Sequence, residues 1–106
     1  MSRSLDELTA LAAKVSDIYA DIYRIERDAD WFLFKLQEEL GELTAEHLRL
    51  TQRGRTKDRS EAEIAEARED EAADLLAFLL LYARHAGIDL DAALERKWFG
   101  YLSEKP

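Results

Sequence analysis

Hydrophobic residues near the start of the chain recur every three or four positions, which is the spacing of an amphipathic helix. Ser4, followed by Glu7, forms a capping-box pair that satisfies the first free N–H groups of a helix. We therefore expect a first helix after Ser4, with an apolar face made of Leu5, Leu8, Leu11, Ala12, Val15, Ile18, Tyr19, Ile22 and Ile25.

A second helix is predicted from about Asp30 to Thr51 by the same spacing. Residues 52–59, which follow it, include no hydrophobic side chain and contain Gly54, so this segment is interpreted as a connecting loop. On the second helix, the stripe expected to face the protein core consists of Phe32, Leu36, Leu40, Leu43, His47 and Leu50.

The rest of the chain predicts one long and one short helix. Ser60 and Glu63 repeat the capping-box pattern, and we expect the third helix to run from about Glu61 to His85. Gly87 suits the left-handed position that ends many helices. From Leu75 onward this helix is apolar on all sides, which is typical of a buried helix. Asp89 would cap a short fourth helix that carries Leu90, Ala93, Leu94, Lys97, Trp98 and Tyr101.

No segment alternates apolar and polar residues between turn signals, and the single Pro is the last residue, so no strand is predicted. The expected fold is all-α: one domain over residues 1–106, built as an antiparallel bundle of three long helices and a short C-terminal one. Three rods of roughly 30 to 37 Å enclose only a thin core. We therefore expect oligomerisation to complete the bundle, as a homodimer or a homotetramer.

Charge and composition narrow the function classes. Fifteen Lys and Arg against 23 Asp and Glu give a net charge of −8, which disfavours nucleic acid as a partner. The chain has no Cys, so a metal would be bound by oxygen or nitrogen ligands. The first residues carry acids where a signal peptide needs an apolar stretch, and no apolar run reaches the roughly 20 residues that span a bilayer. A cytoplasmic protein without membrane contact is the expectation.

Acidic residues cluster on the second and third helices. At about 100° per residue, Glu38, Glu39 and Glu42 fall within one arc, which by itself could be an ordinary solvated face. Glu71 and Asp74 share a face of the third helix that continues as an apolar surface, where an unpaired carboxylate is costly. Across an antiparallel helix pair, Glu39, Glu42, Glu71 and Asp74 could bind one divalent cation. Oxygen ligands favour Mg²⁺, with Mn²⁺ as a possible substitute.

Cations and aromatic rings that could bind a phosphate substrate are also present. Magnesium on clustered carboxylates is typical of phosphate chemistry. Lys35 lies among the glutamates, and Lys97 is on the last helix. Arg55 lies in the loop, which could equally be a solvated linker. Trp31 could stack on a base, although an aromatic at a helix start is more often part of the core.

Two segments resemble the signatures of a known enzyme family. Residues 35–43, Lys-Leu-Gln-Glu-Glu-Leu-Gly-Glu-Leu, resemble the Glu-Glu-x-x-Glu motif of the MazG-like, all-α nucleoside triphosphate pyrophosphohydrolases. Residues 71–81, Glu-Ala-Ala-Asp followed by an apolar helix, resemble their second motif, Glu-x-x-Asp. Both motifs occur in order, at a separation similar to that in the family, and the resemblance covers roughly residues 31–97.

The resemblance implies magnesium-dependent cleavage of a nucleoside triphosphate between its α and β phosphates, used to remove unwanted nucleotides. By motif position it makes Glu39, Glu42, Glu71 and Asp74 the metal ligands. It leaves Glu38 to orient or deprotonate the attacking water, and it matches Lys97 to a phosphate-binding lysine.

The chain also departs from the family pattern. Phe78 replaces a frequent Tyr, while Tyr101 and Glu104 stand where an Asn and a basic residue are common. Two alternatives therefore stay open at this stage. One is a related phosphoribosyl-ATP pyrophosphohydrolase, and the other is a helical interaction or regulatory dimer without turnover.

Overall fold

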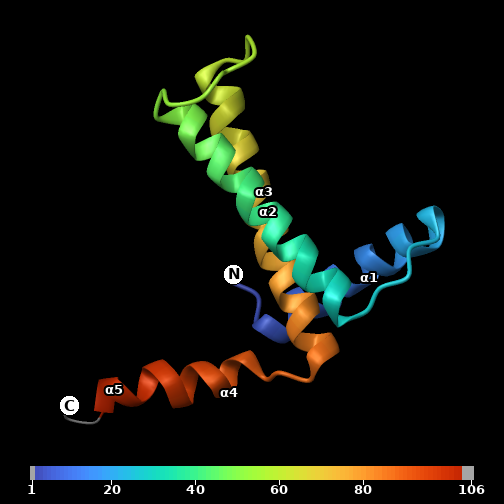
Figure 1. Ribbon diagram of the computed structural model, residues 1–106. Coiled ribbons are helices and arrows are strands. Elements are labelled where there is room, and N and C mark those ends of the chain that lie inside the picture. Colours follow the sequence, from blue (N-terminus) through green and yellow to red (C-terminus); the bar gives the residue numbers. More distant parts are fainter. Residues whose placement is uncertain (1, 104–106) are drawn as a thin grey trace.

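A computed structural model describes residues 2–103, and its regular elements are all helices (Figure 1). The three long helices are α1 (Leu5–Tyr23), α2 (Ala29–Leu50) and α3 (Glu61–Ala86). The chain then continues through α4 (Leu90–Leu94), the π-helical turn η1 (Glu95–Phe99) and α5 (Gly100–Ser103). No strand forms within residues 2–103, which confirms the prediction of an all-α protein.

The predicted starts of α1 and α3 and the predicted end of α3 at Gly87 are confirmed, whereas Ile25, expected on the first helix, lies beyond the end of α1 at Tyr23. Ser4 Oγ accepts a hydrogen bond from the Glu7 backbone N–H at 3.1 Å, and Glu7 Oε1 accepts one from the Ser4 N–H at 3.0 Å. Ser60 and Glu63 make the same reciprocal pair at the start of α3, at 3.1 and 2.8 Å. Gly87 ends α3 with a φ of 72°, the left-handed conformation that favours glycine.

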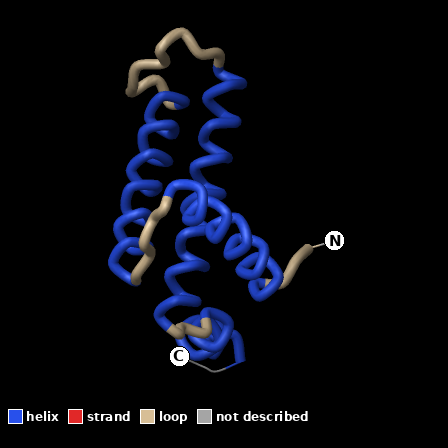
Figure 2. The backbone as a smooth tube through the Cα atoms, turned by 90° about the vertical axis from the view of Figure 1, so that its right-hand side faces the viewer, coloured by secondary structure: helices blue, strands red, loops and turns tan. Residues whose placement is uncertain are grey.

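The centre of the fold is the antiparallel pair formed by α2 and α3, which lie side by side along most of their length (Figures 1 and 2). The loop over residues 51–60 joins them at one end of the pair. At the other end α1 crosses α3 and packs on it, while the segment from α4 to α5 turns away from the pair (Figure 1). The single chain is therefore more open than a closed bundle.

The face that α2 turns toward α3 includes acids where hydrophobic residues were expected. Leu40 is 52% exposed and His47 is also exposed, whereas Glu39 and Glu46 are buried. The prediction that Leu40 and His47 face the core is therefore wrong. The physical reason is that α2 is rotated about its own axis relative to the predicted orientation. The spacing alone does not distinguish the two orientations, because both stripes recur with helical periodicity. The buried and half-buried positions of this face are Phe32, Leu36, Glu39, Leu43, Glu46 and Leu50.

Buried Glu46 is compensated by two arginines near the loop. Arg59 Nη2 donates to Glu46 Oε1 at 2.8 Å and Arg59 Nη1 donates to Glu46 Oε2 at 3.3 Å, while Arg49 Nη1 lies 3.3 Å from Glu46 Oε2. The hydrogen bonds from Arg59 lower the pKa of Glu46, so the carboxylate stays ionised. This forked pair fastens the start of α3 to the end of α2.

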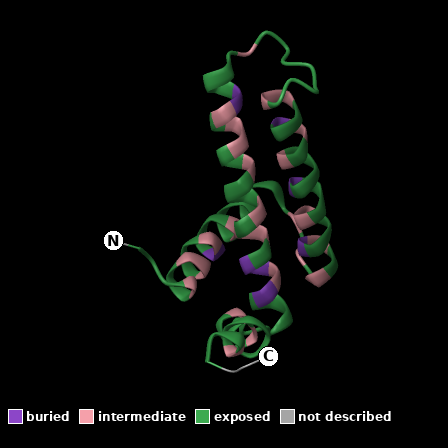
Figure 3. Cartoon of the chain, turned by 90° about the vertical axis from the view of Figure 1, so that its left-hand side faces the viewer, coloured by how far each residue is buried: buried purple, intermediate pink, exposed green. Residues whose placement is uncertain are grey.

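The apolar core lies where α1 meets the α2–α3 pair. Ala13, Phe32 and Leu81 are buried there (Figure 3). The expectation that α3 is buried on all sides after Leu75 is wrong, because α1 covers one side and Leu76 is left 45% exposed. No helix within residues 2–103 has the length and hydrophobicity that crossing a bilayer requires.

We predict that Glu46→Gln lowers Tm by about 5 °C at pH 7, because the amide leaves Arg59 without its charged partner. The pKa of Glu46 is lowered from 4.5, so the stabilisation is complete above pH 4.5 and is lost as the pH falls further. Thermal denaturation followed by circular dichroism at pH 7 and pH 3 measures both effects. Glu66→Gln, a change of an exposed glutamate on α3, is the control. An equal Tm for the wild type and Glu46→Gln at pH 7 would contradict the role of the pair.

Candidate metal centre

Three carboxylates from the two paired helices converge at the middle of the α2–α3 contact. Glu39 and Glu42 come from α2, and Glu71 comes from α3. Each offers one oxygen atom, and the three atoms all lie within 4.8 Å of one another. Asp74, one turn after Glu71, is exposed and lies at the edge of this group, near Glu39. The structure thus brings together three of the four acids that the sequence nominated and places the fourth beside them.

The helix geometry explains why these acids meet. Glu39 and Glu42 are separated by three residues, as are Glu71 and Asp74, so each pair shares one face of its helix. Glu39 occupies an inward position of α2, and the antiparallel arrangement places it opposite Glu71. The packing of α2 against α3 therefore holds the carboxylates of Glu39, Glu42 and Glu71 together, with Asp74 at their edge.

Burial makes this cluster electrostatically unfavourable without a counter-charge. Oε2 of Glu39 and Oε2 of Glu71 are buried and have no hydrogen-bond partner within residues 2–103. Burial, followed by hydrogen bonds with Glu42 and Glu39, raises the pKa of Glu71 to about 8. Burial also raises the pKa of Glu39 and of Asp74. Protons or a cation must therefore neutralise part of the cluster.

The residues fit a hard divalent cation. All donors are carboxylate oxygens, the ligands that Mg²⁺ and Mn²⁺ prefer, and two of those oxygens are orphaned in the interior. Glu42 is exposed, so the cluster opens to solvent on one side. A cation held there could keep positions open for water or for a phosphate oxygen.

Lys35 and Glu38 lie beside the cluster as an ion pair. Lys35 Nζ is 2.6 Å from Glu38 Oε1. The hydrogen bond to Glu38 is the main cause that raises the pKa of Lys35, and the charges of Glu39 and Glu42 raise it further. Lys35 therefore places a positive charge next to the acids, while Glu38 is exposed and directed to Lys35.

Two aromatic rings border the same lysine. Trp31 and Phe78 make an edge-to-face contact with 5.9 Å between ring centroids. Lys35 Nζ lies 5.8 Å from the Trp31 ring and 5.9 Å from the Phe78 ring, within cation–π range. The sequence analysis treated Phe78 as the loss of a hydroxyl and missed this contact. The signal was available, because Phe78 follows Asp74 by one helical turn, as Lys35 follows Trp31.

The single chain does not bring the other nominated cations to the acids. Arg55 lies in the loop beyond the end of α2, and Glu42 is eight residues before that end, a distance of about 12 Å along the helix. Lys97 lies on η1, in the segment that turns away from the α2–α3 pair (Figure 1). Glu104, the other departure from the family pattern, lies outside the described residues.

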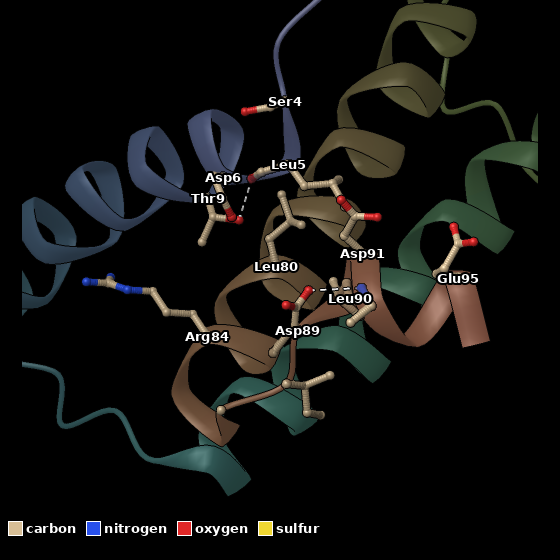
Figure 4. A pocket seen from close by; sticks show the side chains of 14 residues that line it. Ser4, Leu5, Asp6, Thr9, Leu80, Arg84, Asp89, Leu90, Asp91 and Glu95 are labelled. Carbon is tan, nitrogen blue, oxygen red and sulfur yellow. Dashed lines mark hydrogen bonds between the residues drawn. The ribbon is translucent and has the colours of Figure 1, made fainter. Parts of the chain in front are cut away.

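A hollow of about 870 Å³ lies elsewhere, where the start of α1, the end of α3 and α4 meet (Figure 4). Some of its polar side chains make hydrogen bonds within their own helices. Asp89 Oδ1 accepts a hydrogen bond from the Ala92 N–H at 3.0 Å, and Thr9 Oγ1 donates one to the Leu5 carbonyl at 2.7 Å. Size alone therefore does not make this hollow the better functional candidate.

Comparison of the chain with protein-family models, curated proteins and solved structures found no match. The candidate site therefore depends on its own geometry and on the two sequence motifs.

We predict that the stability of the metal-free protein falls as the pH rises from 4.5 to 8. Glu71 has a pKa of about 8 in the folded protein against 4.5 as its ordinary value, so the folded state binds more protons across this window. Glu71→Gln should flatten the fall and raise Tm at pH 8 by about 4–8 °C, because an amide can donate to the remaining carboxylates. Thermal melts in a chelator at pH 5.5 and pH 8 measure this.

Glu66→Gln again provides the matched control, since it removes one exposed carboxylate from the same helix. If Glu71→Gln and the wild type lose stability in parallel, the cluster is not the source of the pH dependence.

Proposed function

We propose that this protein is a Mg²⁺-dependent nucleoside triphosphate pyrophosphohydrolase, which cleaves the bond between the α and β phosphates to give a monophosphate and pyrophosphate. The observation that carries the proposal is the convergence of Glu39, Glu42 and Glu71 from two facing helices, with Asp74 beside them and two buried oxygens unpaired within residues 2–103. The two acid motifs that resemble those of the MazG-like enzymes support it.

The four clustered acids are the proposed cation ligands. When bound, Mg²⁺ would supply positive charge that attracts the phosphate oxygens and polarises the reacting phosphoryl group. The carboxylates hold that charge on rigid helices rather than on loops, which favours accurate positioning. The exposed side of the cluster, at Glu42, is where a triphosphate would approach.

Lys35 and Glu38 are the proposed phosphate-binding and proton-accepting groups. Lys35 already lies beside the acids, so its ammonium can contact a phosphate oxygen that approaches them. That contact would compete with the present ion pair and release the Glu38 carboxylate. Glu38 would then orient the attacking water and accept its proton.

Trp31 and Phe78 are the proposed contacts for the base. Their rings lie next to Lys35, so a base bound on them would be close to phosphates bound at the lysine. Aromatic faces stack on any base, which makes this contact a source of affinity more than of selectivity. We propose that the protein forms a homo-oligomer and that its cellular role is the removal of unwanted nucleotides.

We predict that the purified protein with Mg²⁺ converts at least one canonical or modified (d)NTP to monophosphate and pyrophosphate. Glu39→Gln should lower kcat by about 100-fold or more, because it removes a buried charged ligand while keeping the shape of the side chain. Glu66→Gln, which alters an exposed acid outside the cluster, should keep wild-type activity. Chromatographic separation of mono-, di- and pyrophosphate products measures this.

The same assay separates the alternatives. Turnover of phosphoribosyl-ATP but of no nucleoside triphosphate would replace the proposed substrate class with the related one. If nothing is hydrolysed while Mg²⁺ still raises Tm, the cation site stands and the hydrolase proposal falls. Absence of both turnover and a Mg²⁺-dependent Tm shift would overturn the proposed function as a whole.

A further inference from the structure

Helix α1 packs on the rest of the chain through its smaller side chains. Ala13 is buried against Leu81, and Ala12, Ser16 and Ala20 on the same side of α1 are half-buried. Small residues allow the helix to approach α3 closely. This leaves most of the large hydrophobic residues of α1, from Leu11 onward, without a place in the core of the single chain.

The opposite side of α1 is an exposed hydrophobic stripe, the α1 stripe, formed by Leu11, Val15, Ile18 and Ile22. Their exposed fractions are 46%, 58%, 59% and 64%. They follow one another at intervals of four, three and four residues, which is the a/d spacing of a coiled-coil seam. A regular seam of this kind is suited to pairing with another helix.

The surface area of the chain is large enough to require such a partner. The accessible surface is 8573 Å², whereas a compact monomer of 12.2 kDa is expected to expose about 6,100 Å². The excess of about 2,500 Å² per chain exceeds the roughly 800 Å² that each partner buries in a standard interface. The radius of gyration is 16.7 Å, against about 13 Å for a compact domain of this length.

We propose that two copies of this chain pair through their α1 stripes, antiparallel and about a two-fold axis. In this arrangement Val15 of one copy lies opposite Ile18 of the second, and Leu11 lies opposite Ile22. The stripe is then complementary to itself, as a symmetric interface requires. A second copy is therefore favoured over an unrelated protein as the occupant.

Charges beside the stripe favour the antiparallel direction. Lys14 and Asp21 are seven residues apart, so both border the same edge of the stripe. Antiparallel pairing brings Lys14 of each copy near Asp21 of the other, twice by symmetry. Parallel pairing brings Lys14 near Tyr19 instead and forms neither ion pair. The acid cluster contributes nothing to this argument, so the inference does not depend on the proposed catalytic activity.

The first test is the mass of the full chain in solution, by analytical ultracentrifugation over a concentration series. We expect a species of twice 12.2 kDa for the wild type. Val15→Glu/Ile18→Glu should raise the dissociation constant at least about 100-fold, because it places four carboxylates in the seam. Both residues are exposed in the single chain, so the helical circular dichroism spectrum should be unchanged.

The matched control is Ala10→Glu/Ala62→Glu, because both alanines are exposed and lie off the α1 stripe, so the variant has the same change in net charge. This variant also adds two glutamates but leaves the hydrophobic contact intact, so it should weaken the dimer far less than Val15→Glu/Ile18→Glu. A monomeric wild type at every concentration would overturn the proposal. Equal weakening by both double variants would also overturn it, since net charge rather than the stripe would then govern association.

Cross-linking tests the direction, because the natural chain has no Cys. Leu11 and Ile22 are eleven residues apart, about 16 Å along the helix. A mixture of Leu11→Cys and Ile22→Cys chains should form a disulfide between the two variants under oxidation. Ile22→Cys alone should not, since its two copies lie beyond the roughly 7 Å between Cα atoms that a disulfide can bridge. Efficient cross-linking of Ile22→Cys to itself would overturn the antiparallel pairing.

Discussion

Carboxylates at inward positions of the α2–α3 pair are the constraint on which the rest of the structure depends. Both Glu39 and Glu46 face α3, and each would be costly there as an isolated charge. Glu46 has Arg59 and Arg49 beside it, so it remains ionised and joins the two helices. Glu39 instead meets Glu71, another acid. One inward carboxylate thus strengthens the fold, and the other must be neutralised by protons or by a cation.

The acid cluster lies between two regions that hold the helix pair together. On the loop side, the forked ion pair of Glu46 and Arg59 fixes the ends of α2 and α3. On the other side, Phe32 packs with Leu81 in the core under α1. Supported from both sides, the crowded acids cannot separate without breaking one of these contacts. The carboxylates are therefore held close together at a fixed position despite their mutual repulsion. Such preorganisation favours ion binding.

Capping residues and other local sequence patterns predicted the helix ends. They did not show which of two possible faces of α2 points toward α3. Ser4, Ser60 and Gly87 act through neighbouring backbone groups, so their sequence context was sufficient. The stripe of α2 could not be chosen in the same way, because Leu40 lies on a helical repeat as regular as that of Glu39. The partner arginine for Glu46 lies 13 residues along the chain, across the loop. The acids of the cluster were predictable from their spacing, but the contact of Lys35 with the Trp31 and Phe78 rings was not predicted.

The open shape of the chain determines which positively charged residues lie near the candidate metal centre. Lys35 is positioned beside the acids, whereas Arg55 and Lys97 lie on segments that extend away from them. Under the proposed function, a triphosphate would bring several negative charges to a protein whose net charge is already −8, so Lys35 and a divalent cation would have to supply most of the attraction in a single chain. The exposed hydrophobic residues around Lys97, such as Trp98 at 66%, indicate that its segment is itself unpacked. A role of Lys97 at the acids would therefore require this segment to pack against the α2–α3 pair of its own chain or of a second one.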